Sequence, residues 1–84
     1  MKLKSLGANQ TEIDIDGGMK VLFSYETPVA AFDAKTGRAF RTTAKWSTTT
    51  TRHIDKWIGD NPQVSYMAQD WFHRIVAASE PMHA

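Results

Sequence analysis

The sequence contains no cysteine. This absence excludes disulfide bonds, thiolate nucleophiles and thiolate metal ligands. No stretch approaches the roughly 20 consecutive apolar residues that a membrane-spanning helix needs. Residues 1–4 are followed by glycine, asparagine and glutamine and not by the apolar segment of a secretory signal. We therefore expect a cytoplasmic protein that does not engage a membrane.

Net charge is also small. The formal charge is +1, which provides no attraction of the whole molecule to nucleic acid or membrane. The bases are nevertheless unevenly distributed, because residues 35–56 carry a single acid, Asp55, and these bases: Lys35, Arg38, Arg41, Lys45, Arg52 and Lys56. Glu12, Asp14 and Asp16 form an earlier acidic cluster. Either the basic segment faces an anionic partner, or the acidic cluster lies beside it and neutralises it.

The chain of 84 residues suits one small domain, residues 1–84. Polar and apolar residues alternate before Gly17 and Gly18, and β-branched and aromatic residues follow, which predicts a β-hairpin. Pro28 ends the second strand of this hairpin. The complete prediction is a four-stranded antiparallel meander with short connections, formed by residues 11–16, 19–25, 29–32 and 39–43.

A helix is predicted where the hydroxyl-rich run begins. Ser47 is suited to cap its first turn, and Trp46 is placed to pack back onto that turn. Gly59 follows the last periodic residue and ends the helix. The side chains of one helical face recur at the expected spacing: Thr50, Ile54, Trp57 and Ile58.

A second helix is predicted over residues 66–78, with Ser65 as its cap and this apolar stripe: Ala68, Trp71, Phe72, Ile75 and Val76. Residues 1–5 and 79–84 are expected to fray. Strands followed by helices indicate an α+β fold in which both helices pack on one face of the sheet.

No motif for catalysis is present. His53 and Asp55 are two residues apart and point away from each other on a helix. His73 and His83 share no ligand spacing with His53, so we expect no metal site. The sequence therefore predicts a protein that is not an enzyme and that carries no catalytic residue and no cofactor.

Candidate binding residues gather around the start of the first helix, where free amides and the helix dipole attract anions. His53 has a second interpretation, a half-buried imidazole that bonds a sheet carbonyl or a threonine hydroxyl. The binding candidates are Arg38, Arg41, Lys45, Trp46, Thr49, Thr50, Arg52, His53 and Lys56. Structural roles are expected for Ser47, Ile54, Trp57 and Trp71.

Two segments carry a family resemblance: SYETPVA at residues 24–30 and WSTTTTRHI at residues 46–54. Together they resemble a family of small proteins encoded mainly by tailed bacteriophages and related mobile elements. That family has the pattern S-Y-x-T-P-V-A followed by aromatic-S-x-T-T-x-basic-H-I. The resemblance covers residues 6–58. It implies an accessory role in a bacterial cell, and it brings no catalytic residue with it.

Three functions remain open from the sequence. The leading hypothesis is a non-enzymatic protein that binds and modulates a host protein complex, for example as an anti-defence protein of the anti-CRISPR kind. The second is a nucleic-acid-binding module that uses the basic segment 35–56. The third is a self-assembling structural or packaging protein. A host or phage protein is the partner expected from the first, and a homo-oligomer from the third.

Overall fold

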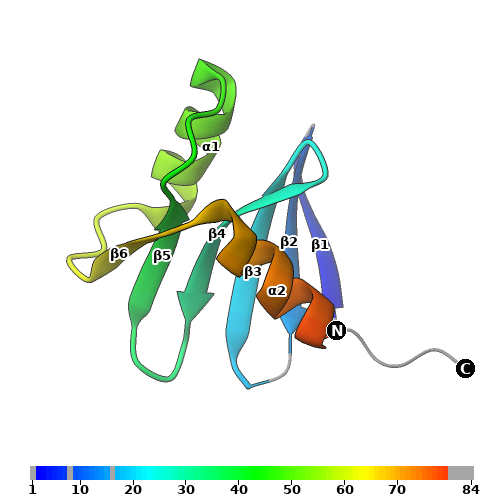
Figure 1. Cartoon of the computed structure of the whole chain (residues 1–84), viewed down its shortest axis with the longest axis vertical. Helices are drawn as coiled ribbons and strands as arrows, with labels where there is room; N and C mark the ends of the chain where they lie inside the picture. Colours follow the sequence, from blue (N-terminus) through cyan, green and yellow to red (C-terminus); the bar gives the residue numbers. More distant parts are fainter. Residues whose placement is uncertain (1, 8, 16, 80–84) are drawn as a thin grey trace, which may run out of the picture.

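A computed structural model describes residues 2–7, 9–15 and 17–79. Within these residues, six strands form one sheet in the order β1 to β6, and two helices are present (Figure 1). The elements are β1 (Lys2–Gly7), β2 (Gln10–Ile15), β3 (Met19–Ser24), β4 (Thr27–Asp33), β5 (Arg38–Thr42), α1 (Thr48–Ile58), β6 (Val64–Met67) and α2 (Gln69–Ser79). The predicted α+β class is therefore confirmed.

The predicted hairpin is present as β2 and β3, in which Ile15 lies opposite Met19. Gly17 and Gly18 connect the two strands with φ values of 88° and 82°, a conformation that favours glycine because a Cβ atom strains it. Strands β1 to β5 pair antiparallel with their neighbours, as a meander requires.

The prediction of four strands was too low, because β1 and β6 were missed. Residues 2–5, predicted to fray, belong to β1, where Leu3 lies opposite Ile13. Leu3 remains 72% exposed, so its pairing leaves little trace in the hydrophobic pattern. Residue 1 and residues 80–84, also predicted to fray, lie outside the described residues, and Ser79 is the last residue of α2.

Ser65 was predicted to cap the second helix and residues 66–67 to form its first turn, but residues 64–67 form β6, which runs parallel to β5. Val64 and Tyr66 favour strands, and their backbone pairs with a strand that is distant in sequence. Ser65 therefore caps no helix, and its hydroxyl accepts a hydrogen bond from Arg38 Nη1 at 2.9 Å. The helix begins later, at Gln69.

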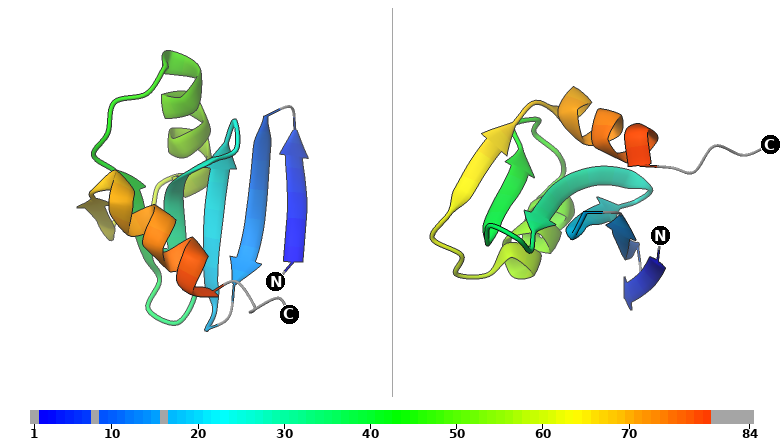
Figure 2. Two further views of the ribbon diagram at one scale, coloured as in Figure 1. Left: turned by 45° about the vertical axis from the view of Figure 1, so that its right-hand side comes forward. Right: turned by 90° about the horizontal axis from the view of Figure 1, so that it is seen from below.

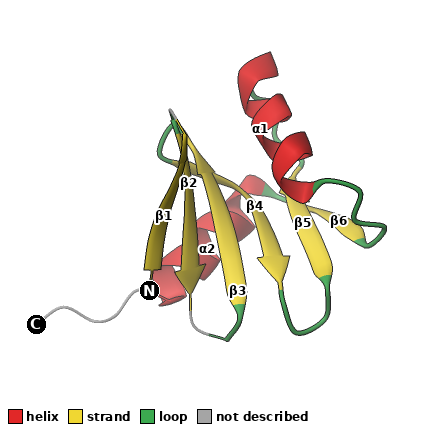
Figure 3. Ribbon diagram, turned by 180° about the vertical axis from the view of Figure 1, so that it is seen from behind, coloured by secondary structure: helices red, strands yellow, loops and turns green. Residues whose placement is uncertain are grey.

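The two helices cover opposite faces of the sheet, which corrects the prediction of a single covered face (Figures 2 and 3). Ile54 of α1 packs in a cluster with Leu22, whereas Phe72 of α2 packs in another cluster with Val21. Val21 and Leu22 are adjacent in β3, so their side chains point to opposite faces, and both are fully buried.

The parallel pairing of β5 and β6 explains this arrangement. A chain that leaves one strand and returns parallel to it must cross over a face of the sheet. Helix α1 forms that crossover and occupies one face. Helix α2 follows β6 and packs back across β4 on the other face. Neither helix in the described part of the chain is long and apolar enough to cross a membrane.

Candidate binding surface

Ser24, the last residue of β3, joins the sheet to α1. Its hydroxyl oxygen lies 3.1 Å from Thr50 Oγ1 and 2.9 Å from His53 Nδ1. Thr50 and His53 are three residues apart on α1 and therefore face the sheet together. Ser24 is 2% exposed and Thr50 is 5% exposed. Neither hydroxyl can meet a ligand, and both serve to attach the helix to the sheet.

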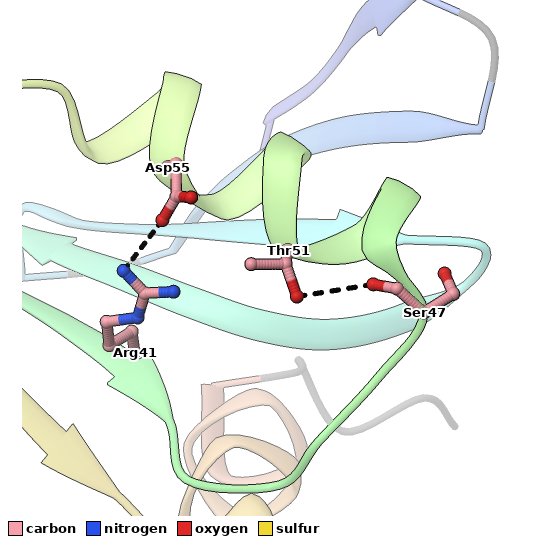
Figure 4. A network of polar contacts seen from close by, with 4 residues as sticks. All are labelled: Arg41, Ser47, Thr51 and Asp55. Carbon is pink, nitrogen blue, oxygen red and sulfur yellow. Dashed lines mark hydrogen bonds and ion pairs between the residues drawn. The ribbon is translucent and has the colours of Figure 1, made fainter.

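Ser47 is the N-cap of α1, and its Oγ accepts from the Thr50 amide at 3.2 Å. The Thr51 hydroxyl donates to the Ser47 carbonyl at 3.2 Å (Figure 4). These bonds satisfy polar groups that the start of a helix otherwise leaves without partners. Much of the hydroxyl-rich run is therefore used to begin the helix.

The hydroxyls form a series that ends at His53. The Ser47 hydroxyl donates to Thr50 Oγ1 at 3.4 Å. The Ser24 hydroxyl lies within hydrogen-bond distance of both Thr50 Oγ1 and His53 Nδ1, so it continues the series from the helix start to the imidazole. His53 therefore bonds the sheet through the Ser24 hydroxyl. The sequence had predicted a bond to a sheet carbonyl or a threonine hydroxyl.

Gln69, the first residue of α2, forms a second network. Its Oε1 accepts from the Thr42 hydroxyl at 2.7 Å and from Trp46 Nε1 at 3.3 Å. Its Nε2 donates to the Pro28 carbonyl at 2.6 Å and lies 3.3 Å from His73 Nε2. Trp46 therefore bonds the start of α2 through its indole, although the sequence placed it on the first turn of α1.

An exposed aromatic ring lies beside His53. Tyr25 is 50% exposed, and its ring stacks on the imidazole with 6.0 Å between centroids. Tyr25 and Glu26 connect β3 to β4 with φ values of 51° and 69°, which are unusual for residues with bulky side chains. Asn9 also has a positive φ, and its carbonyl accepts from the Tyr25 amide at 2.9 Å. Strained backbone is therefore concentrated at one end of the sheet.

Part of the predicted binding set shares one stripe of α1. Thr49, Arg52, His53 and Lys56 recur at spacings of three and four residues, so they lie along the same side of the helix. Thr49, Arg52 and Lys56 are exposed, and His53 is half-buried. We call this stripe, together with Tyr25 and Glu26, the tip surface.

The other predicted binding residues do not join the tip surface. Arg41 Nη1 pairs with Asp55 at 2.8 Å on another side of α1 (Figure 4), and its guanidinium lies 5.6 Å from the centre of the Tyr66 ring. Arg38 is three residues before Arg41 on β5, so its side chain points to the opposite face of the sheet. Lys45 is exposed in the loop before α1. The basic segment therefore does not form one continuous face.

Of the residues assigned structural roles, Ile54, Trp57 and Trp71 lie in the two cores, whereas Ser47 is the exposed N-cap of α1. Ile54 is 3% exposed, and Trp57 donates from Nε1 to Glu12 Oε1 at 2.9 Å. Trp71 contacts the rings of Phe40 and Phe72, with centroids 4.9 Å and 5.0 Å away. No group of three or more metal-ligating side chains occurs in the part of the chain that the structure describes.

Sequence reasoning missed the roles of Ser24 and Gln69. Ser24 is the last residue of β3, and a serine at the end of a strand usually indicates only that a turn follows. Gln69 lies outside the apolar stripe predicted for the second helix, and that helix begins later than predicted. The signal that could have indicated both networks was the pair of motif segments at residues 24–30 and 46–54. The first segment contains Ser24 and Pro28, and the second contains Trp46, Thr50 and His53.

The fold and the two networks define a small α+β protein in which polar side chains attach one helix to each face of a sheet. The chain belongs to a family of unknown function, DUF8033, whose model matches residues 1–74. No curated protein and no solved structure matches the chain.

Proposed function

We propose that this protein is a non-enzymatic binding protein that docks on a protein partner through the tip surface. The observation that carries the proposal is the backbone at Tyr25 and Glu26. Strained conformations of non-glycine residues cost about 1–3 kcal/mol each, and they are concentrated at functional sites. Here the strain holds a half-exposed aromatic ring against His53.

The chemistry around Tyr25 suits a protein interface. Tyrosine and arginine are the residue types that most often dominate binding energy, and Arg52 lies next to His53 on the helix. On its other side, Tyr25 borders a hollow of about 300 Å³ that is lined also by Leu3, Ile13 and Phe23. A partner side chain can enter this hollow while the partner surface covers the ring.

The two bases of the tip surface outnumber its one acid, Glu26, and this excess favours an acidic partner. Arg52 and Lys56 are exposed on α1, and Asp55 between them in the helix is paired with Arg41 at 2.8 Å. Opposite charges across an interface increase the rate of association and select among partners. The resemblance to bacteriophage proteins supports a host protein complex as the target, and modulation of a host defence complex as the role.

Affinity capture from bacterial lysate treated with nuclease tests this function. We expect the wild-type protein to retain a stoichiometric protein partner, and Tyr25→Asn to weaken retention about 30-fold, as the loss of about 2 kcal/mol at a hot spot implies. Asparagine tolerates positive φ, so this variant removes the ring and keeps the turn. The double variant Arg52→Glu and Lys56→Glu is expected to lose the partner as well.

Lys35→Glu is the matched control. Lys35 is exposed in the β4–β5 turn, at the end of the sheet opposite the tip surface, so a charge reversal of the same kind there is expected to leave capture intact. Equal retention by the control and the tip variants would contradict the proposal, as would recovery of no protein partner from plausible hosts.

Nucleic-acid binding is less well supported. Arg38 and Arg41 point to opposite faces of the sheet, and Arg41 is occupied by Asp55. An electrophoretic mobility shift at low salt tests this alternative, because phosphate contacts are strongest there and weaken steeply as salt rises.

A further inference from the structure

The two edges of the sheet differ in how they are protected. On β1, Lys4 is exposed, and the pairing with β2 is irregular between Ser5 and Gly7. Lysines and irregular pairing on an edge strand oppose pairing with another chain. On β6, the sequence VSYM has no charge and no proline. Tyr66 is 64% exposed, and no described element lies beyond this strand (Figure 1).

The backbone of β6 has hydrogen-bonding groups to offer at this edge. Ala39 N donates to the Gln63 carbonyl at 2.8 Å, and Thr43 N donates to the Met67 carbonyl at 2.9 Å. In a parallel ladder, alternate residues bond the neighbouring strand. Residues 63, 65 and 67 therefore face β5, and Val64 and Tyr66 direct their N–H and C=O groups outward.

We propose that β6 pairs antiparallel with β6 of a second copy of this chain, about a two-fold axis through Ser65. In this register Val64 of one copy lies opposite Tyr66 of the other. These are the residues whose backbone groups face outward, so each pair exchanges two hydrogen bonds. Ser65 lies opposite Ser65 at the intervening position that makes no bonds across the axis. In any other register, some of the outward N–H and C=O groups of Val64 and Tyr66 have no partner on β6 of the second copy.

The side chains of β6 agree with a second copy as the occupant. An aromatic residue opposite a β-branched residue stabilises a cross-strand pair, and both side chains lie on the face of α1. The strand itself carries no charge, so its pairing with a second copy brings no like charges together. The nearby Arg41 on β5 is paired with Asp55 at 2.8 Å. Because Lys4 opposes pairing at β1, head-to-tail growth is disfavoured and assembly stops at a closed dimer.

The dimer is expected to be reversible. Stable protein interfaces bury about 1,200–2,000 Å², and a strand of four residues provides only part of that area. In sedimentation equilibrium between about 10 µM and 1 mM, a range suited to weak dissociation constants, we expect the average mass to rise from 9.4 kDa toward twice that value.

Two variants at position 66 distinguish the contribution of the backbone N–H to dimerisation from the contribution of the tyrosine ring. Tyr66→Pro removes an outward N–H, and proline is tolerated on an edge strand when its N–H would face solvent. This variant is expected to stay monomeric throughout the concentration range while circular dichroism shows an intact fold. Tyr66→Thr keeps the N–H and the strand preference, and it is expected to dimerise at higher concentration than the wild type.

Amide hydrogen exchange tests the same pairing without a substitution. Exchange at Val64 and Tyr66 is expected to slow at least about 10-fold between dilute and concentrated protein, because an amide in a ladder is protected from solvent. A wild-type chain that stays monomeric at the highest concentration would overturn the proposal. A dimer that persists unchanged in Tyr66→Pro, or exchange at both amides that is independent of concentration, would also overturn it.

Discussion

Replacing Ser24 by alanine removes the centre of the network that joins β3 to α1. The hydroxyl makes contacts of 3.1 Å to Thr50 and 2.9 Å to His53, and it is 2% exposed. Each such hydrogen bond contributes about 0.5–1.5 kcal/mol net. Thr50 keeps its contact with Ser47 at 3.4 Å, and the half-buried His53 can bond water. We therefore expect Ser24→Ala to lower the free energy of unfolding by about 1–3 kcal/mol.

Urea denaturation followed by tryptophan fluorescence measures this loss, and thermal unfolding gives a second estimate. A loss of about 2 kcal/mol corresponds to a decrease in Tm of about 8–16 °C in a domain of this size. Thr49→Val is the matched control, because Thr49 is exposed on the same helix and surface substitutions usually change stability by less than about 0.5 kcal/mol.

A double-mutant cycle with Thr50→Val tests whether the network acts as a unit. Residues in one hydrogen-bond network show coupling energies of about 0.5–3 kcal/mol, so the double variant is expected to lose less stability than the two single variants added together. The reasoning is refuted if Ser24→Ala costs no more than the Thr49→Val control, or if the two losses are additive.

Three further changes have defined outcomes. Gln69→Ala is expected to lower the free energy of unfolding by about 2–4 kcal/mol in urea, because the Pro28 carbonyl and other partners lose their bonds; an unchanged midpoint would mean that water replaces the amide. Glu26→Asn is expected to raise Tm by a few degrees, since asparagine suits positive φ at little cost, and a fall in Tm would contradict the assignment of strain. Asp55→Ala is expected to cost less than about 1 kcal/mol, because the carboxylate paired with Arg41 is 58% exposed; a larger loss that persists in high salt would contradict this estimate.

The elements that sequence predicted well depend on contacts between near neighbours. The hairpin of β2 and β3 follows from alternating residues and two glycines, and α1 follows from its cap at Ser47 and its periodic face. A helix or a hairpin records its own period and its own turn in consecutive residues. These features were therefore readable without knowledge of the rest of the fold.

The candidate site was only partly predictable for the same reason. The stripe with Arg52 and His53 follows from helical spacing, which the sequence displays directly. The separation of Arg38 from Arg41 depends on which strands surround β5, and the burial of Thr50 depends on the distant Ser24. Charge counted along the chain gave no means to tell an exposed base from one that is paired across the sheet.

Local pattern thus decided the class of the fold, the start and end of α1 and the identity of the hairpin, because those features depend on residues close in the chain. Tertiary structure alone decided that β6 is a strand, that the helices cover opposite faces and that Ser24 meets His53. Those outcomes depend on backbone pairing and packing between residues far apart in sequence, such as Arg41 and Tyr66 in adjacent strands. A backbone hydrogen bond depends little on side-chain identity, so strand pairing of this kind leaves only a weak signal in the sequence.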